Sequence, residues 1–276
     1  MSSSISAATN GQKLAGKGQF EDKIVWVTGA SSGIGEAVSQ AFASMGAKVL
    51  LIARSEDHLI RISKELMQFY QIPVSYLKMD VSKKDEVEKG IKSLPEDFAM
   101  PDILVNSAGL ARGLKTAAET TYAESDEMID TNIKGVINFT KAVVPIMIQK
   151  NSGHIFMIGS VAGIKPYANG AVYCGTKAFI ESYNLSLREE LVKTRVRLTL
   201  ISPGMVGHTK FSNVRLGNDE VAASVYKDIT PLTPLDISDQ IIFAASRPTH
   251  VNIAHIESYP VHQASTTTLY RGDIIP

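Results

Sequence analysis

The chain has 276 residues, of which 44% are hydrophobic, and its 28 basic and 28 acidic side chains balance. This length and apolar content predict one large globular domain with an ample core, and the zero net charge excludes the basic surface that binds nucleic acid. The single cysteine, Cys174, excludes an intramolecular disulfide and favours a reducing, cytoplasmic location. We also expect no membrane span and no catalytic metal, because no apolar stretch is long enough and no metal-ligand spacing occurs.

The first segment, residues 1–22, is rich in serine, alanine and glycine, which predicts a flexible tail rather than a signal or transit peptide. We expect residues 23–276 to form a single domain. The domain opens with an apolar strand, 23–28, followed by Gly29-Ala-Ser-Ser-Gly33-Ile-Gly35 and a helical pattern over 36–45. Glycines at such a turn allow a phosphate to approach the backbone, and the helix N-terminus offers it free N–H groups. Taken alone, the pattern fits a simple turn equally well.

The second predicted strand, 48–54, ends in Ala53-Arg54-Ser55. In dinucleotide-binding folds an acid at this point binds the ribose hydroxyls, whereas a base suits a 2′-phosphate. Arg54 is placed to pair with that phosphate, and no carboxylate is present to repel it. The strand end therefore favours NADP(H) over NAD, and the alternative is a surface arginine before the helix predicted over 56–70.

Two more strands, 74–79 and 102–106, end in polar or small residues. Asp80 either contacts an adenine or caps the helix that begins near Ser82. Ser107, Ala108 and Gly109 follow the fourth strand and would let the chain pass close to a cofactor. A long helical pattern then covers 122–150 and contains Asn132, a poor helix former whose side chain we expect to be solvated or locally bonded.

A fifth buried strand, 154–159, delivers Ser160, and a helical pattern carries Tyr173 and Lys177 four residues apart on one face. A free phenol titrates near pKa ~10, and a nearby cation lowers that pKa. A serine hydroxyl at the same substrate oxygen would orient it. A Tyr-x-x-x-Lys pair alone is more often an ordinary helix face. Ser160 and the glycine turn make proton transfer the favoured interpretation, with Cys174 as a packing residue.

The alternation of strands and helices predicts an α/β fold with a doubly wound parallel sheet of about seven strands and helices on both faces. Ligands of such sheets bind beyond the carboxyl ends of the strands. A sixth strand over 195–201 completes the pattern before Pro203 and Gly204. The polar and glycine candidates fall at or just after strand ends, and they are Gly29, Arg54, Asp80, Asn106 and Ser160.

These motifs resemble those of the short-chain dehydrogenases/reductases over residues 24 to about 209. The matching positions are Thr28-Gly29-x-x-x-Gly33-x-Gly35, Asn106-Ser107-Ala108-Gly109, Asn132, Ser160, Tyr173-x-x-x-Lys177 and Pro203-Gly204. Ser107 departs from the family, which usually has a second asparagine there. The segment from Pro203 to Arg215 and the tail to Gln263 resemble the NADP-dependent 3-hydroxy acid dehydrogenases, including serine 3-dehydrogenases, L-allo-threonine dehydrogenases and fungal members.

The resemblance implies a Rossmann-like oxidoreductase in which hydride passes between a nicotinamide and a small-molecule substrate. It implies that Tyr173 is the general acid/base, that Lys177 lowers its pKa and holds the nicotinamide ribose, and that Ser160 binds the substrate oxygen. Asn132 would support a water chain to Lys177. It also implies a homotetramer and an NADP(H) site made of Gly29, Ser31, Ser32, Gly33, Ile34, Gly35, Arg54, Ser55, Asp80, Val81, Asn106, Ala108, Gly109, Tyr173, Lys177, Pro203, Gly204, Val206 and Thr209.

A 3-hydroxy acid carries a carboxylate, which a cation near the pocket would bind. Arg215, in the substrate loop expected over 203–230, and Arg112 are the two candidates, and each is equally consistent with a surface or interface role. Two other functions stay open. One is a broad-specificity NADPH-dependent carbonyl reductase of ketones and ketoesters. The other is a nucleotide-sensing protein without catalysis, which the presence of both Tyr173 and Lys177 disfavours. The end, 253–276, is either a tetramer contact or a last strand and a loose tail.

Overall fold

A parallel sheet of seven strands in the order β3-β2-β1-β4-β5-β6-β7 forms the centre of the computed structural model, which describes residues 18–274. Every pairing along it is parallel, from β2 with β3 to β6 with β7. The prediction of a doubly wound parallel sheet is confirmed. The strands are β1 (Ile24–Thr28), β2 (Lys48–Ala53), β3 (Val74–Lys78), β4 (Ile103–Asn106), β5 (Gly153–Ile158), β6 (Val196–Pro203) and β7 (His255–Ser258).

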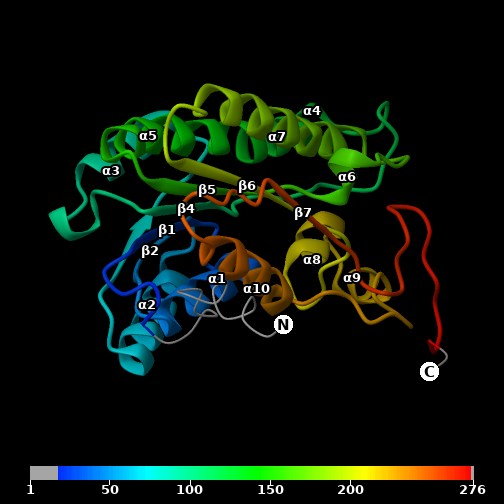
Figure 1. The fold of residues 1–276 in the computed structure, drawn as a ribbon. Helices are drawn as coiled ribbons and strands as arrows, with labels where there is room; N and C mark the ends of the chain where they lie inside the picture. Colours follow the sequence, from blue (N-terminus) through cyan, green and yellow to red (C-terminus); the bar gives the residue numbers. More distant parts are fainter. Residues whose placement is uncertain (1–17, 275–276) are drawn as a thin grey trace, which may run out of the picture.

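Helices cover both faces of this sheet (Figure 1). One face carries α3 (Lys84–Lys92), α4 (Tyr122–Ile129), α5 (Gly135–Lys150) and α7 (Ala171–Glu190), and the other carries α1 (Gly33–Ser44), α2 (Glu56–Tyr70) and α10 (Pro234–Ala245). Three short helices lie near the carboxyl edge, and they are α6 (Val161–Ile164), α8 (Phe211–Leu216) and α9 (Asp219–Ser224). Among residues 18–274 no helix has the length and apolar character needed to cross a bilayer.

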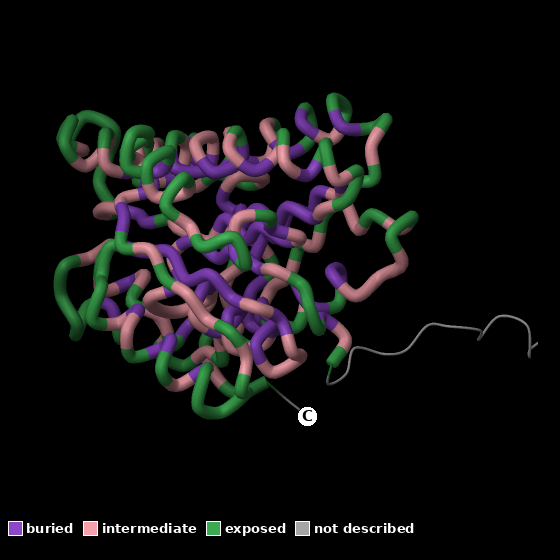
Figure 2. Tube along the Cα trace, turned by 90° about the vertical axis from the view of Figure 1, so that its left-hand side faces the viewer, coloured by how far each residue is buried: buried purple, intermediate pink, exposed green. Residues whose placement is uncertain are grey.

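The five central strands, β1, β2, β4, β5 and β6, are mostly buried (Figure 2), and their side chains alternate between two separate cores. In β1, Val25 and Val27 pack with α1, α2 and α10, whereas Trp26 points into the core under α5 and α7. The same alternation occurs in β2, where Leu51 and Leu50 enter opposite cores. Period-two alternation within nearly continuous apolar runs is typical of parallel strands between two helical layers.

The described chain begins before the predicted domain boundary. Most of the predicted tail, residues 1–17, lies outside the described residues. The part that is described, 18–22, forms a turn, and Phe20 is buried with its ring 5.0 Å from that of Phe42 in an edge-to-face arrangement. The Phe20 backbone also donates to the carbonyl of Met45. This turn therefore belongs to the packed domain.

The turn after β1 requires its glycines. Gly29 has φ +68°, and a side chain there would lie 2.9 Å from the backbone of Ala108. A Cβ at Gly35 would lie 2.4 Å from the Gly29 carbonyl oxygen, so only glycine allows α1 to pack this closely on the turn. The Thr28 hydroxyl then accepts hydrogen bonds from the backbones of Ser107 and Ala108, at 3.1 Å each. The carboxyl ends of β1 and β4 are thereby joined into one platform.

Candidate active site

A cavity of about 580 Å³ opens at the carboxyl edge of the sheet. Most of the residues proposed from the sequence line it, and they are Gly29, Ser31, Ser32, Gly33, Ile34, Arg54, Ser55, Asp80, Val81, Ala108, Gly109, Ser160, Tyr173, Lys177, Pro203, Gly204, Val206, Thr209 and Arg215. Four proposed residues lie outside the lining: Gly35, Asn106, Asn132 and Arg112. The structure thus brings the ends of the strands and the Tyr173 helix to a single site.

Arg54 and Asp80 mark one end of the cavity. Arg54 is exposed at the end of β2 and forms no hydrogen bond or ion pair within residues 18–274, so its guanidinium is available to an anion. Asp80 accepts from the Ser82 backbone at 2.9 Å and lines the cavity as well. The helix itself begins at Lys84 with Lys83 as its N-cap, so Asp80 closes a turn before the helix rather than capping it.

Ser160, Tyr173 and Lys177 meet at the middle of the cavity. Ser160 is the N-cap of α6, where its hydroxyl accepts from the Ala162 backbone at 3.1 Å. Tyr173 and Lys177 lie on successive turns of α7, as predicted, with the ammonium 5.9 Å from the centre of the phenol ring. The Lys177 Nζ donates to the carbonyl of Ile158 at 2.8 Å. The strand β5 therefore fixes both Ser160 and the direction of the lysine.

Burial controls the titration of both groups. It lowers the pKa of Lys177 to about 8, because removal from water disfavours the charged form. Burial also raises the pKa of Tyr173, while hydrogen bonding with Ser160 and the charge of Arg215 act in the opposite direction. Contrary to expectation, the pKa of Tyr173 is therefore raised rather than lowered, and a role of Lys177 in lowering it stays a prediction. The phenol is protonated at neutral pH.

Asn132 lies next to Lys177 rather than on the surface. It occupies a five-residue π-helical turn, η2 (Asp130–Lys134), between α4 and α5. Its amide nitrogen donates to the carbonyl of Leu110 at 2.8 Å and to the hydroxyl of Thr176 at 3.0 Å. Its amide oxygen accepts from the Leu110 backbone at 2.9 Å. Of the two expectations for Asn132, a solvated or a locally bonded side chain, the structure is closer to the second. The bonding partners, however, are distant in sequence.

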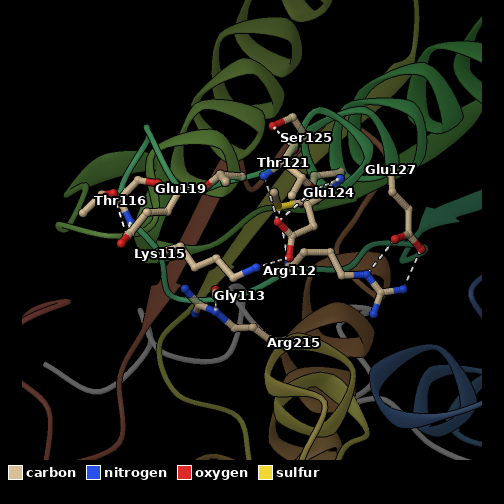
Figure 3. A network of polar contacts seen from close by, with 12 residues as sticks. Arg112, Gly113, Lys115, Thr116, Glu119, Thr121, Glu124, Ser125, Glu127 and Arg215 are labelled. Atoms are coloured by element: carbon tan, nitrogen blue, oxygen red, sulfur yellow. Dashed lines mark hydrogen bonds and ion pairs between the residues drawn. The ribbon is translucent and has the colours of Figure 1, made fainter.

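Of the two candidate arginines, Arg215 lines the cavity and Arg112 does not. Its guanidinium carbon lies 5.4 Å from the Tyr167 ring centre and 5.7 Å from that of Tyr173. Its Nη2 is buried and has no hydrogen-bond partner among the described residues. Arg112 instead binds Glu127 through two nitrogens, at 2.6 and 2.7 Å, and lies outside the cavity lining (Figure 3).

Several residues of the cavity wall were missed by the sequence argument. Tyr167 stacks against Arg215 and lies in the loop between Ser160 and Tyr173, where a lone aromatic residue among small ones was the available signal. The C-terminal segment supplies Gln263, Thr266 and Leu269. The tail pattern ended at Gln263 but did not assign it to the cavity, and no sequence pattern marked Thr266 or Leu269. Gln263 accepts from the Met205 backbone at 2.8 Å, so this segment closes one wall of the cavity. Asn106, in contrast, is buried beneath the site and donates to Thr140.

The residues present fit a phosphorylated dinucleotide. The backbone at Gly29 and Gly33 has positive φ and is bare of side chains where α1 begins, which suits a phosphate at a helix N-terminus. Arg54 lies where a 2′-phosphate requires a cation. Among residues 18–274 no group of three or more histidine, cysteine, aspartate or glutamate side chains is arranged to hold a metal ion.

Comparisons with known proteins agree with this geometry. A family model described as short chain dehydrogenase matches residues 23–218. The NADP-dependent 3-hydroxy acid dehydrogenase YdfG of Salmonella typhi is 44% identical over 242 residues, which cover 87% of this chain and 96% of that protein. The NADP-dependent 3-hydroxy acid dehydrogenase of Schizosaccharomyces pombe is 40% identical, with coverages of 92% and 98%. The resemblance drawn from the motifs is confirmed.

A solved structure also superimposes closely. The closed form of a serine dehydrogenase complexed with NADP+ is 41% identical, has a TM-score of 0.84, and is matched over 92% of this chain and 99% of that chain.

Lys177→Met should stabilise the protein at neutral pH. The folded lysine loses its proton near pH 8 and the unfolded lysine only near 10.5, so between these values the unfolded state binds more protons and stability rises with pH. Below pH 8 the buried ammonium lowers stability, by about 3 kcal/mol at most, offset by its hydrogen bond to Ile158. We expect a net gain of ~1–2 kcal/mol at pH 7 that shrinks by pH 10.

Urea unfolding of the cofactor-free protein at both pH values would measure this gain. The exposed Lys141→Met is the matched control and should show no pH-dependent difference. If the gain in the free energy of unfolding were the same at pH 7 and pH 10, the pKa of Lys177 would not be lowered by burial.

Proposed function

Because the chain belongs to the short-chain dehydrogenase family, we propose that it is an NADP-dependent oxidoreductase that interconverts a 3-hydroxy acid and its 3-oxo product. β-Hydroxy amino acids such as serine and allo-threonine belong to this substrate class. The observation that carries the proposal is the position of Arg215, which lines the cavity with its guanidinium carbon 5.7 Å from the centre of the Tyr173 ring and has one buried nitrogen without a hydrogen-bond partner among the described residues.

We assign the proton transfer to Tyr173. When bound, the nicotinamide accepts or supplies the hydride. The protonated, buried phenol donates its proton to a ketone oxygen in reduction, and in oxidation it receives the hydroxyl proton after ionising. Ser160 binds the same oxygen, and the cations of Lys177 and Arg215 favour the ionised phenol when it forms. Asn132 holds the Leu110 loop and Thr176 in place around Lys177.

We assign binding of the substrate carboxylate to Arg215. In a 3-hydroxy acid the carboxylate lies two bonds from the reacting carbon, so the anchor must be adjacent to the proton donor. Arg215 satisfies this because its guanidinium carbon lies over the Tyr173 ring, 5.7 Å from the ring centre. Its Nη2 has no partner, and a buried guanidinium nitrogen without an acceptor is energetically unfavourable. A carboxylate oxygen would supply that acceptor.

A second candidate is a broad carbonyl reductase. The wall of the cavity contains apolar side chains from several segments, which are Leu110, Leu114, Phe211, Val214, Val225 and Leu269. Such a surface would admit ketones and ketoesters that lack a carboxylate. The two functions share the same proton donor, so they differ only in dependence on Arg215.

We further propose that the protein is a homotetramer of the cytoplasm. Apolar side chains are exposed on α5 and α7, among them Ile148 at 45% and Leu185 at 47%, and Val261 near the C-terminus is 86% exposed. Such exposure supports contact with further copies. Light scattering should give about four times the chain mass of 29.9 kDa, and a monomer mass would contradict the proposal. The buried, unpaired Cys174 supports a reducing location.

Arg54→Ala should weaken NADPH binding by about tenfold or more, because a charge-assisted phosphate contact is lost. NADH, which lacks the 2′-phosphate, should be affected less than about threefold. Fluorescence titration of both cofactors would measure this. Arg61→Ala is the matched control, because Arg61 is an exposed arginine of the adjacent helix that pairs with Glu36 and Glu65. Equal losses of affinity for NADPH and NADH would show that Arg54 has a structural role rather than a role in phosphate binding.

Arg215→Met should raise KM for 3-hydroxy acids by about ten- to a hundredfold, because an ionic hydrogen bond to the carboxylate is lost. The KM for a plain secondary alcohol such as 2-butanol should change by less than about threefold. NADPH formation followed by absorbance, with L-serine, L-allo-threonine, 3-hydroxybutyrate and 2-butanol, measures both.

Tyr173→Phe is the control for the Arg215 experiment and should lose turnover with every substrate. The broad carbonyl reductase would be favoured if the wild type had equal kcat/KM on alcohols and acids and if Arg215→Met left both values unchanged.

A further inference from the structure

The helix that carries Arg215 is attached to the rest of the domain by the packing of Phe211 against the Tyr173 ring, 5.7 Å between ring centres, and by a small polar network. Phe211, Ser212, Val214 and Arg215 of α8 all line the cavity, so the position of this helix determines the shape of the substrate end. A six-residue helix is too short to be stable by itself. Its position must therefore be set by contacts with other segments.

One set of contacts stays within the substrate loop. The Ser212 hydroxyl lies 2.8 Å from that of Tyr226, and the Asn213 amide donates to Asp219 at 2.6 Å. Both partners belong to the same 203–230 segment. These bonds hold α8 to α9 and to Tyr226. They would stay intact if the whole 203–230 segment moved as a unit.

The other set joins α8 to the loop that follows β4. The Gly113 backbone donates to the Arg215 carbonyl at 2.7 Å, and the Arg215 Nε donates to the Gly113 carbonyl at 3.0 Å (Figure 3). Arg112 adds a third bond, from its Nη1 to the Val214 carbonyl at 2.8 Å. Gly113 has φ +62°, a conformation that favours glycine.

The side chain of Arg112 is itself held in place by Glu127. Its Nε and Nη2 form a bidentate pair with Glu127 of α4, which leaves Nη1 directed at α8 (Figure 3). Fork-to-fork pairing fixes the plane of a guanidinium better than a single contact does. Arg112, which lies in the β4–α4 loop, thus joins α4 to α8 through its side chain.

We propose that Arg112 is a positioning residue, which together with Glu127 clasps α8 over the cavity and so sets Arg215 against Tyr173. Both members are about one-third exposed, so the ion pair is partly screened by water and the clasp is weak enough to open. Opening would release α8 with its own loop and allow substrate to enter. The kinetic part of this proposal rests on the proposed carboxylate role of Arg215, whereas the clasp itself does not.

Hydrogen–deuterium exchange of the full chain tests the clasp directly. Arg112→Met should raise exchange of the amides in 211–217 by about fivefold or more, because opening becomes more frequent. Arg112→Lys retains one ionic contact and should give an intermediate rise. Lys115→Met is the matched control, because Lys115 in the same loop pairs at 2.7 Å with Glu124 of the same helix. It should leave exchange in 211–217 within about twofold of wild type.

The pair is tested by combining substitutions. If Arg112 depends on Glu127 for its position, Glu127→Gln should raise exchange in the same peptide, and adding it to Arg112→Met should change nothing further. Unchanged exchange of 211–217 in Arg112→Met would overturn the clasp, and so would fully additive effects.

Kinetics then test whether the clasp positions Arg215. In Arg112→Met, KM should rise about fivefold or more for 3-hydroxybutyrate and less than about twofold for 2-butanol. An equal rise for both substrates would overturn the positioning role. If the wild type oxidised no 3-hydroxy acid, the proposed function would fail, and the exchange result would still decide the clasp.

Discussion

The burial of the Tyr173 phenol beside two cations is the constraint on which the rest of the site depends. Removal from water favours the neutral forms of both Tyr173 and Lys177. The proton transfer that we propose for Tyr173 nevertheless needs a phenol that can ionise during the reaction. The site satisfies both demands by placing Arg215 against the ring and Lys177 one helical turn away. The ionised phenol is then disfavoured at rest but stabilised by fixed charges when it forms.

These charges are held in place by the sheet edge. The Ile158 carbonyl at the end of β5 binds the Lys177 ammonium, and Ser160 follows two residues later. Gly109, after β4, has no side chain where Lys177 and Asn132 approach, since a Cβ would lie 3.3 Å from the Asn132 oxygen and 3.6 Å from the ammonium. Parallel strands end at one edge, so residues far apart in sequence meet without long loops.

The sequence allowed prediction of the fold and of most of the cavity wall because those features are local. Buried strands are continuous apolar runs, and the residue after each run must lie at the edge. The π-helical turn at Asn132 was not predicted, because its hydrogen bonds go to Leu110 and Thr176, distant in the chain. The engagement of Arg112 with Val214, 102 residues away, left no sequence signal either. Spacing placed Lys177 beside Tyr173 but gave no information on where its ammonium points.

Two features to which we assign function, the buried Lys177 and the short helix α8, contribute little to stability, and both line the same cavity. A buried ammonium with a lowered pKa opposes folding at neutral pH, and a six-residue helix held by partly exposed polar contacts adds little. The stability must therefore come from the two apolar cores on either side of the sheet. This division would allow the proposed movement of α8 without loosening the strands that fix Ser160 and Lys177. Substrate entry and proton transfer are thus assigned to separate parts of the structure, and Arg215 is the residue that connects them.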